Sequence, residues 1–173
     1  MLEIFMRYLI VVDMQVDFIN GALGSKDAEA IVPTVVEIVR NFDGSVIFTR
    51  DTHGEDYLST REGRRLPVPH CIKGTAGHEI CPELLPYVKT VVDKETFGST
   101  ALAGIIRAGG EEIEEIVLLG LCTDICVISN AMLLKAEFPE AEITVVSSAS
   151  AGVTPESHEA ALSAMRAVQI NVI

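Results

Sequence analysis

Short, continuous apolar runs alternate along this chain with stretches of helical periodicity, and this alternation restricts the fold more than any other feature. Six runs have the length of a strand: Tyr8–Asp13, Ser45–Arg50, Thr90–Lys94, Ile116–Leu121, Glu142–Ser148 and Gln169–Ile173. Runs that are apolar throughout are typical of strands covered on both faces. Helical stretches lie between them at Ala28–Phe42, Ser99–Ala108, Asp124–Phe138 and Pro155–Ala167. We therefore expect a three-layer α/β/α fold with a mostly parallel, Rossmann-like sheet of about six strands.

The composition describes an ordinary globular chain and excludes two classes of partner. Its 173 residues are 49% hydrophobic and 22% charged, which suits a single domain over residues 1–173 with a substantial core. Thirteen basic residues against twenty-five acidic ones leave a net charge of −12. Nucleic acids and anionic membranes need clustered Lys and Arg, so neither is expected as a partner.

A cytoplasmic location is expected. The apolar runs are too short to span a membrane, and the N-terminus lacks the pattern of a signal peptide. Met6 is an alternative start, because a complete first strand still follows it. Four cysteines would allow two disulfides, but a chain with a core of this size does not need them. A reduced protein is therefore favoured.

The residues that end the apolar runs carry most of the chemistry. The runs end in or lead to Asp13, Asp51 with His53, Lys94, and Cys126. Ligands of open α/β sheets bind outside the carboxyl ends of the strands, so these groups are expected at one edge. The fifth run leads to Ala149–Gly152, which is expected to be a plain connection. The interval from Asp51 to Tyr87 predicts at most a short helix near His78–Leu85, and loops of that length are usually functional.

Cys126 follows the point where an apolar run meets a helical pattern. With Thr123 or Asp124 as N-cap, Cys126 falls in the first helical turn, where free N–H groups and the helix dipole favour a thiolate. Such a turn is a platform for a nucleophile. The alternative is a packing role, since free cysteines are among the most buried residues. An aspartate and a lysine at the same edge favour the nucleophile, because one can accept the thiol proton and the other stabilises the thiolate.

Five segments resemble the isochorismatase-like cysteine hydrolases and, within that family, the nicotinamidases. They are Val11–Phe18, Thr49–His53, Pro69–Gly77, Lys94–Phe97 and Gly120–Val127, in the family's order. The resemblance implies a catalytic triad of Asp13, Lys94 and Cys126. It also implies a non-proline cis peptide bond between Leu121 and Cys122, in a turn whose N–H groups at residues 122 and 126 face the developing oxyanion.

The nicotinamidase resemblance adds a divalent metal ion held by Asp51, His53 and His70. Two nitrogens and one oxygen with open positions suit a catalytic Zn²⁺, with Mn²⁺ or Fe²⁺ as alternatives. Glu62 follows His53 by nine residues, where some nicotinamidases place a further carboxylate ligand. It lies among three arginines, so surface ion pairs are its alternative role.

Two departures from the nicotinamidase pattern concern the substrate pocket. Thr52 stands where nicotinamidases commonly carry a Trp, so the aromatic wall must come from elsewhere. Cys122 stands where the family usually has a small residue such as Ala, and it fits by size. The candidates for the aromatic wall are Phe18, Tyr57 and Phe97.

The resemblance implies hydrolysis of nicotinamide to nicotinate and ammonia, and of pyrazinamide, through a thioester on Cys126. Such an enzyme serves NAD salvage, a route of pyridine nucleotide biosynthesis, takes a small-molecule amide as its partner, and is often a homo-oligomer. Two alternatives stay open. A metal-free cysteine amidase of the same family would act on a carbamoyl or ureido compound. A catalytically silent α/β module would bind a small molecule, although no Gly-x-Gly-x-x-Gly or phosphate loop follows any run.

Overall fold

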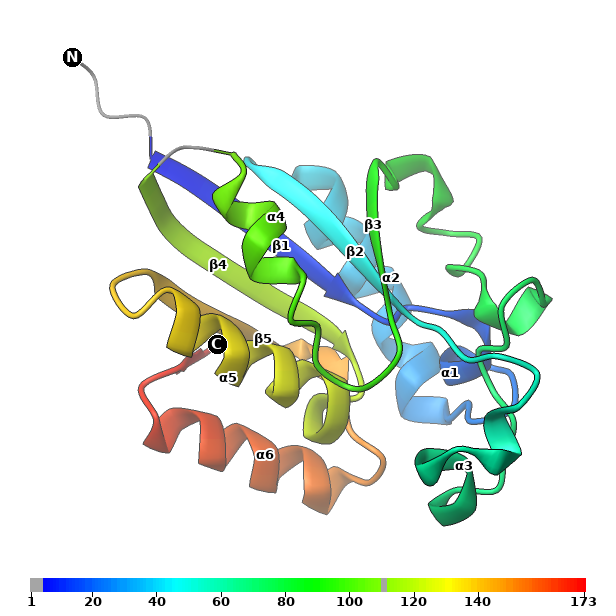
Figure 1. Cartoon of the computed structure of the whole chain (residues 1–173). Coiled ribbons are helices and arrows are strands. Elements are labelled where there is room, and N and C mark those ends of the chain that lie inside the picture. The colour runs from blue at the N-terminus through cyan, green and yellow to red at the C-terminus, as the bar shows by residue number, and fades with distance from the viewer. Residues whose placement is uncertain (1–4, 110–111) are drawn as a thin grey trace.

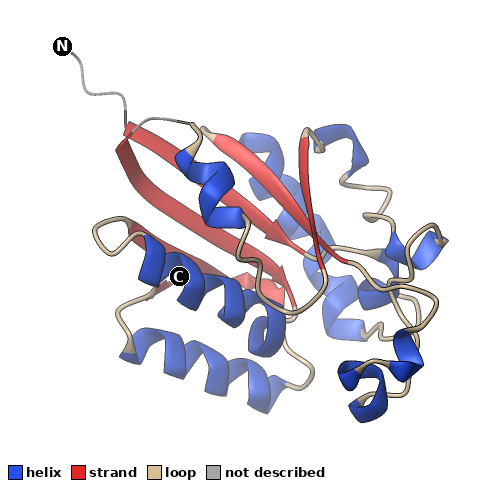
Figure 2. Cartoon of the chain, viewed as in Figure 1, coloured by secondary structure: helices blue, strands red, loops and turns tan. Residues whose placement is uncertain are grey.

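The computed structural model describes residues 5–109 and 112–173 and contains one six-stranded sheet (Figures 1 and 2). The strands are β1 (Phe5–Val12), β2 (Ser45–Asp51), β3 (Thr90–Lys94), β4 (Glu112–Leu121), β5 (Glu142–Ala151) and β6 (Asn171–Val172). Their order is β3-β2-β1-β4-β5-β6, and every neighbouring pair is parallel. The expected α/β fold with a parallel sheet is confirmed.

Helices cover both faces of the sheet (Figure 1). One face carries α1 (Val16–Ile19) and α2 (Lys26–Asn41); the other carries α4 (Leu102–Arg107), α5 (Ile128–Glu137) and α6 (Pro155–Ala167). The continuous apolar pattern of β1 explains this arrangement. Leu9 and Val11 belong to the core beneath α2, while Ile10 and Val12 belong to the core beneath α4, α5 and α6. Because strand side chains alternate between the faces, a doubly covered strand must be apolar at every position.

The helix ends follow local capping chemistry. Helix α2 begins two residues before the expected start, because the Ser25 hydroxyl accepts a hydrogen bond from Ala28 N (3.0 Å) and caps it. Helix α6 has the expected bounds, with Thr154 as N-cap and Pro155 in the first turn. Helix α4 is shorter than the expected Ser99–Ala108 and begins only at Leu102. Ser99 instead gives its N–H to a side chain of α5, so a tertiary contact replaces the first turn.

The segment between β2 and β3 differs from expectation. The sequence predicted at most a short helix near His78–Leu85, and the structure has only 3-10 turns at the two ends of that stretch, Ala76–His78 and Leu85–Tyr87. Its middle is extended because Ile80 forms a bridge with Gln15 and Cys81 N donates to Met14 O (2.9 Å). The sequence pattern also missed the 3-10 turn Tyr57–Ser59 and the helix α3 (Arg61–Arg65).

Strand β5 extends to Ala151, three residues past the expected end at Ser148. Its last residues pair with β4 at Gly120 and Leu121, beyond an irregularity in the register. The connection after β5 therefore starts at the edge where β4 ends. In the described ranges, no helix combines the length and the apolar character that a membrane crossing requires.

Gly120 allows β1 and β4 to meet at their carboxyl ends. It pairs with Val12, and its φ of 118° is a conformation that L side chains rarely adopt. A Cβ at this position would overlap the carbonyl oxygen of Val12. Any side chain at residue 120 would thus push apart the two strands that hold Asp13 and Cys126.

We expect Gly120→Ala to lower the free energy of unfolding by roughly 2–4 kcal/mol, the combined scale of a positive-φ penalty and overpacking. Gly104 in α4 is the matched control, because a Cβ there would meet nothing within 4 Å. Gly104→Ala should leave the stability unchanged or raise it by up to about 1 kcal/mol. Urea unfolding of both variants measures the difference. Equal stabilities of the two variants would contradict this account of Gly120.

Candidate active site

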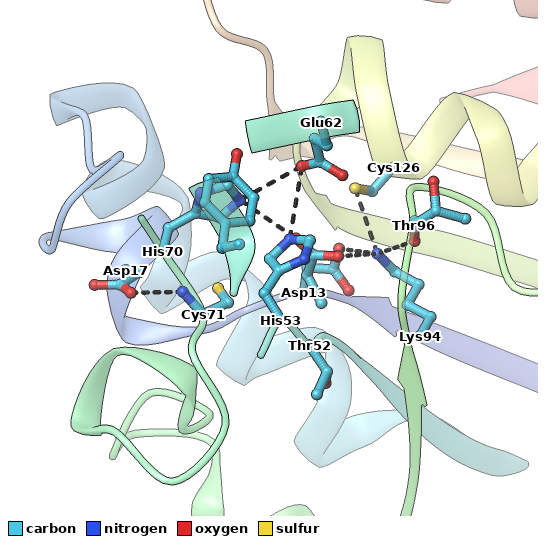
Figure 3. A network of polar contacts seen from close by, with 12 residues as sticks. Asp13, Asp17, Thr52, His53, Glu62, His70, Cys71, Lys94, Thr96 and Cys126 are labelled. Carbon is cyan, nitrogen blue, oxygen red and sulfur yellow. Dashed lines mark hydrogen bonds and ion pairs between the residues drawn. The ribbon is translucent and has the colours of Figure 1, made fainter. Parts of the chain in front are cut away.

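The candidate site lies at the carboxyl ends of β1, β2, β3 and β4 (Figure 3). The chain runs outward from β1 to β2 and β3, then returns to β4 on the other side of β1. In open α/β sheets, this reversal of strand order opens the crevice where ligands bind. Each strand delivers one functional side chain or the turn that carries it.

Asp13, Lys94 and Cys126 lie together, although they come from three separate segments. The Lys94 Nζ atom lies 2.6 Å from Asp13 Oδ2 and 3.5 Å from Cys126 Sγ. It also donates to the carbonyl oxygen of Thr96 (3.1 Å). Thr49 of β2 donates its hydroxyl to Asp13 Oδ1 at 2.6 Å. Asp13 Oδ2 has no hydrogen-bond partner of normal geometry among the described residues, and the Lys94 ammonium lies 2.6 Å from it.

Burial controls the ionisation of this group. Burial raises the pKa of the Cys126 thiol well above its usual value, and the negative charge of Asp13 raises it further, while Lys94 opposes both. Burial likewise raises the pKa of Asp13, against the effect of Lys94. Burial would lower the pKa of Lys94, but the charges of Asp13, Cys126 and Asp51 outweigh it, so the pKa is raised. Burial therefore favours the neutral form of the Cys126 thiol, beside the close contact between Lys94 and Asp13.

The turn that carries Cys126 differs from the expected helix start. Neither Thr123 nor Asp124 is the N-cap; Cys122 holds that position without a side-chain cap, and a π-helical turn, Thr123–Val127, precedes α5. The Thr123 hydroxyl is 2.8 Å from His158 Nδ1, and the Asp124 carboxylate accepts from Val153 N (3.1 Å). Both side chains are thus engaged with the segment after β5. The peptide bond between Leu121 and Cys122 is cis.

The helix N-terminus therefore does not set the charge of Cys126 as expected. Cys126 is only 4% exposed, and the desolvation of its thiolate outweighs the favourable surroundings. Cys122 also lines the site, but burial raises the pKa of its thiol to about 12. Only Cys126 has the Lys94 ammonium within 3.5 Å of its sulfur, which distinguishes the two thiols.

Asp51, His53, Glu62 and His70 form a second cluster, in which one ligand atom from each residue lies within 4.8 Å of all the others. The Asp51 Oδ2 atom is 2.9 Å from His53 Nε2 and 3.5 Å from His70 Nε2. Glu62 Oε1 is 3.6 Å from His53 Nε2 and 3.8 Å from His70 Nε2. Glu62 therefore belongs to the cluster rather than to the surface, because α3 turns it inward (Figure 3).

The two clusters meet at Asp51. Its Oδ1 atom lies 3.5 Å from Lys94 Nζ, while its Oδ2 atom faces the two imidazoles. Burial would raise the pKa of Asp51, but the hydrogen bonds from His53 and His70 and the charge of Lys94 lower it below its usual value. Burial and the nearby charge of Asp51 raise the pKa of Glu62.

A cavity of about 500 Å³ opens onto both clusters. Cys122 and Cys126 form part of its wall, and Asp51, Glu62 and His70 form another part. The remainder is mostly apolar and includes Phe18, Leu23, Leu66, Phe97, Leu121, Ile125 and Val153. Gly152 and Val153 line the cavity, so the connection after β5 is part of the site rather than a plain connection.

The sequence model of the isochorismatase domain matches residues 7–173 of the chain. The chain belongs to the isochorismatase family. The uncharacterized isochorismatase family protein PncA of Bacillus subtilis (strain 168) is 34% identical to it, in an alignment that covers 91% of this chain and 92% of that protein. The nicotinamidase/pyrazinamidase of Mycobacterium tuberculosis is 28% identical, with 97% and 98% covered. The crystal structure of the pyrazinamidase of Pyrococcus horikoshii in complex with zinc has a TM-score of 0.81 at 31% identity, with 96% and 98% covered.

One pocket expectation, that of Tyr57, needs correction in this isochorismatase-family chain. Tyr57 does not line the cavity. It is buried against the cluster of Asp51, His53, Glu62 and His70, with its ring centroid 4.7 Å from that of His53 and 5.0 Å from that of His70. Thr52 also points elsewhere, since its hydroxyl lies 2.8 Å from His78 Nε2. The residue at position 52 thus faces His78, and Phe18 and Phe97 are the aromatic residues of the cavity wall.

Sequence reasoning missed the residue that braces Asp51. Gln15 is fully buried; its Oε1 accepts from Asp51 N (2.8 Å), and its Nε2 donates to Asp51 O and His78 O (both 2.9 Å). In the same way, His70 Nδ1 donates to Val68 O (2.8 Å), which leaves His70 Nε2 free to act as a ligand. The only available signal for Gln15 was its place two residues after Asp13, just beyond the end of an apolar strand.

We expect Asp13→Asn to lower the pKa of Cys126. The negative charge of Asp13 disfavours the thiolate, so its removal must shift the thiolate population towards neutral pH. The ultraviolet absorbance of the thiolate across a pH titration, with Cys126→Ala subtracted, measures this pKa. Asp93→Asn is the control, because Asp93 pairs with Arg50 at the surface (2.7 Å) and should leave the titration unchanged. An unchanged or higher pKa in Asp13→Asn would contradict this electrostatic account.

Proposed function

We propose that this isochorismatase-family chain is a metal-assisted cysteine amidohydrolase that converts nicotinamide to nicotinate and ammonia and also accepts pyrazinamide. One observation carries the proposal: a single cavity presents Cys126 from one side and Asp51, Glu62 and His70 from another. The nicotinamidase/pyrazinamidase relative supports the substrate class, and the pyrazinamidase solved with zinc supports the metal. The proposed place of action is the cytoplasm, where its four free cysteines stay reduced and nicotinate can enter NAD salvage.

Asp13 is the proposed general base and acid. It takes the proton from the Cys126 thiol as the sulfur forms its bond to the amide carbon, and it returns that proton to the nitrogen as the carbon–nitrogen bond breaks. The raised pKa of Asp13 suits both transfers. It makes the carboxylate a stronger acceptor for the thiol proton, and it brings the pKa closer to neutral pH, where one group can serve as both base and acid. Water then hydrolyses the thioester, with Asp13 receiving one of its protons and the thiol reforming. Lys94 keeps its proton throughout and balances the negative charge of the thiolate.

The turn from Leu121 to Cys126 is the proposed oxyanion site. The first N–H groups of a helical turn lack intrahelical partners, and Cys122 is the capping residue of the turn that carries Cys126. The N–H groups of residues 122 and 126 are the proposed donors to the tetrahedral oxyanion. Donors held in place before the reaction stabilise such charge without reorganisation.

The second cluster fits a divalent metal ion by its donor chemistry. Metal–ligand bonds of about 2.1 Å would place neighbouring ligand atoms roughly 3.0–3.4 Å apart. The four separations between the imidazole nitrogens and the carboxylate oxygens lie between 2.9 and 3.8 Å. The buried carboxylate of Asp51 and the partly buried one of Glu62 also favour a cation between them, because burial and the charge of Asp51 raise the pKa of Glu62. When bound, the ion supplies a Lewis-acid site for a ring nitrogen of the substrate.

The cavity wall suits a flat aromatic amide. Phe18 lies beside His70, with ring centroids 5.4 Å apart, and Phe97 lines the cavity on the side of Cys126. A pyridine or pyrazine ring offers apolar faces to such a wall and a nitrogen to a metal, whereas an aliphatic or ureido amide offers neither. Correct placement of a ring at both ends would hold the amide carbon near the sulfur, which is the contribution of orientation to the rate.

Replacement of Cys126 by Ala should reduce nicotinamide turnover on the order of 10⁴-fold or more, because the acyl acceptor is lost. Cys122→Ala is the matched control: it removes the other thiol of the cavity and should retain most of the activity. Release of ammonia from nicotinamide measures both, and thermal unfolding checks that both variants are folded. If Cys122→Ala were inactive and Cys126→Ala active, the assignment of Cys126 as the nucleophile would be wrong.

The metal is tested by binding and by substrate choice. The purified protein should bind one zinc ion, and Glu62→Gln should weaken zinc affinity by about tenfold or more, the scale of a damaged ligand shell. Glu55 is the control, since it is an exposed carboxylate of the same segment, and Glu55→Gln should change nothing. Equilibrium dialysis with metal analysis measures the affinity of each variant.

Substrate choice follows from the same ion. The catalytic efficiency, kcat/KM, should be at least about tenfold higher for nicotinamide than for benzamide, because benzamide lacks the ring nitrogen. Removal of the metal with a chelator should lower the rate on nicotinamide to that on benzamide. Equal rates on the two amides, or no bound metal, would instead favour a metal-free amidase that acts on a ureido compound. No hydrolysis of any amide would favour a silent binding module.

A further inference from the structure

Asn130 is a fully buried polar residue of α5 that the proposed mechanism does not use. Its Oδ1 accepts a hydrogen bond from Ser99 N (2.9 Å), and its Nδ2 donates to Phe97 O (3.1 Å) and to Cys126 O (2.8 Å). The orientation of the amide is unambiguous, because a flipped group would set its oxygen against two carbonyls. One side chain thus joins the turn of the nucleophile to the segment between β3 and α4.

Phe97 depends on this link more than Cys126 does. The turn of Cys126 is also held by hydrogen bonds from Ile125 N and Val127 N to Cys122 O (3.1 and 3.0 Å), and by the contacts of Thr123 and Asp124 described above. The Phe97 side chain is 41% exposed, so its own packing fixes it weakly. Asn130 holds the backbone at Phe97 by two hydrogen bonds, one to the carbonyl of Phe97 and one from the N–H of Ser99.

We propose that Asn130 is a positioning residue for substrate specificity, which sets the distance between the aromatic wall at Phe97 and the sulfur of Cys126. Phe97 and Cys126 line the same cavity, and Asn130 Nδ2 donates to the backbone carbonyls of both residues, so a shift of the Phe97 backbone changes the width available to an aromatic ring. The second anchor of this segment, the Lys94 ammonium bound to Thr96 O, ties the same wall to the triad. Asn130 therefore acts on the substrate through Phe97 and not through the nucleophile. This inference rests on the proposed amidase function.

A double-mutant cycle between Asn130 and Phe97 tests the inference by nicotinamide hydrolysis. Asn130→Ala and Phe97→Ala should each raise KM for nicotinamide about two- to tenfold, the value of an aromatic contact, with a much smaller change in kcat. The double variant should be no worse than either single variant, because Asn130 acts through Phe97. Multiplicative losses in KM, or a loss confined to kcat, would overturn the inference. If Asn130 had only a structural role, Asn130→Ala would lower the thermal stability, and its effect on KM would be the same with or without the Phe97 side chain.

Two further variants keep the test decisive. Asn130→Leu keeps most of the side-chain volume and loses all three hydrogen bonds, so it replaces Asn130→Ala if the smaller side chain prevents folding, with the same expected rise in KM. Asn41 is the matched control: it is an exposed helical asparagine whose Nδ2 donates to Glu37 O, four residues earlier (2.9 Å), as Nδ2 of Asn130 does to Cys126 O. Asn41→Ala should leave every rate unchanged.

Alkylation of Cys126 gives a measurement that does not need turnover. In a Cys122→Ala background, N-phenyliodoacetamide should react faster than iodoacetamide, because its ring packs against Phe97. Asn130→Ala and Phe97→Ala should reduce this preference to the same extent, and the double variant should reduce it no further. A protein that keeps the preference but hydrolyses no amide would refute the proposed function and leave the inference standing. An unchanged preference in Asn130→Ala would refute the inference alone.

Discussion

The site depends on the ion pair between Lys94 and Asp13, which lies in the interior of the protein at 2.6 Å. Both side chains are almost entirely shielded from solvent, with 2% and 0% exposure. An unpaired charge in such a place would be strongly unfavourable, so each residue is tolerable only because the other is present. Asp51 adds a second carboxylate at 3.5 Å from the same ammonium. Lys94 thereby holds together two groups of residues with different chemistry.

This shared cation links Cys126 to the cluster of Asp51, His53, Glu62 and His70, because Lys94 Nζ lies 3.5 Å from both Cys126 Sγ and Asp51 Oδ1. Asp51 faces Lys94 with one oxygen and the imidazoles of His53 and His70 with the other. A positive charge among the imidazoles would draw on the same carboxylate that balances Lys94. Gln15 clamps the backbone of Asp51 and so limits any rearrangement that would relieve this competition. The two clusters are therefore one electrostatic unit, although they perform different tasks.

The periphery of the site is built on a different principle. Around the charged interior, the cavity wall is mostly apolar, and its members come from segments distant in sequence, such as Phe18, Leu66, Phe97 and Val153. These residues are held through their backbones: Asn130 bonds the segment of Phe97, and Asp124 bonds Val153 N. Side chains of the nucleophile turn and of α5 thus position the walls. The shape of the cavity wall can therefore differ without any change in the buried ion pair.

The sequence by itself determined the α/β class, the strands and the groups at their ends, because doubly covered strands must be apolar throughout and their ends must be polar. From this pattern alone Asp13, Lys94 and Cys126 could be expected at one edge. Tertiary structure decided what depends on contacts between distant segments: the inward turn of Glu62, the packing of Tyr57 against the imidazole of His53, and the raised pKa of the Cys126 thiol. It also decided the roles of Gln15 and Asn130. Amide side chains carry no periodicity or charge, so only the partners that the fold brings to them reveal what they do.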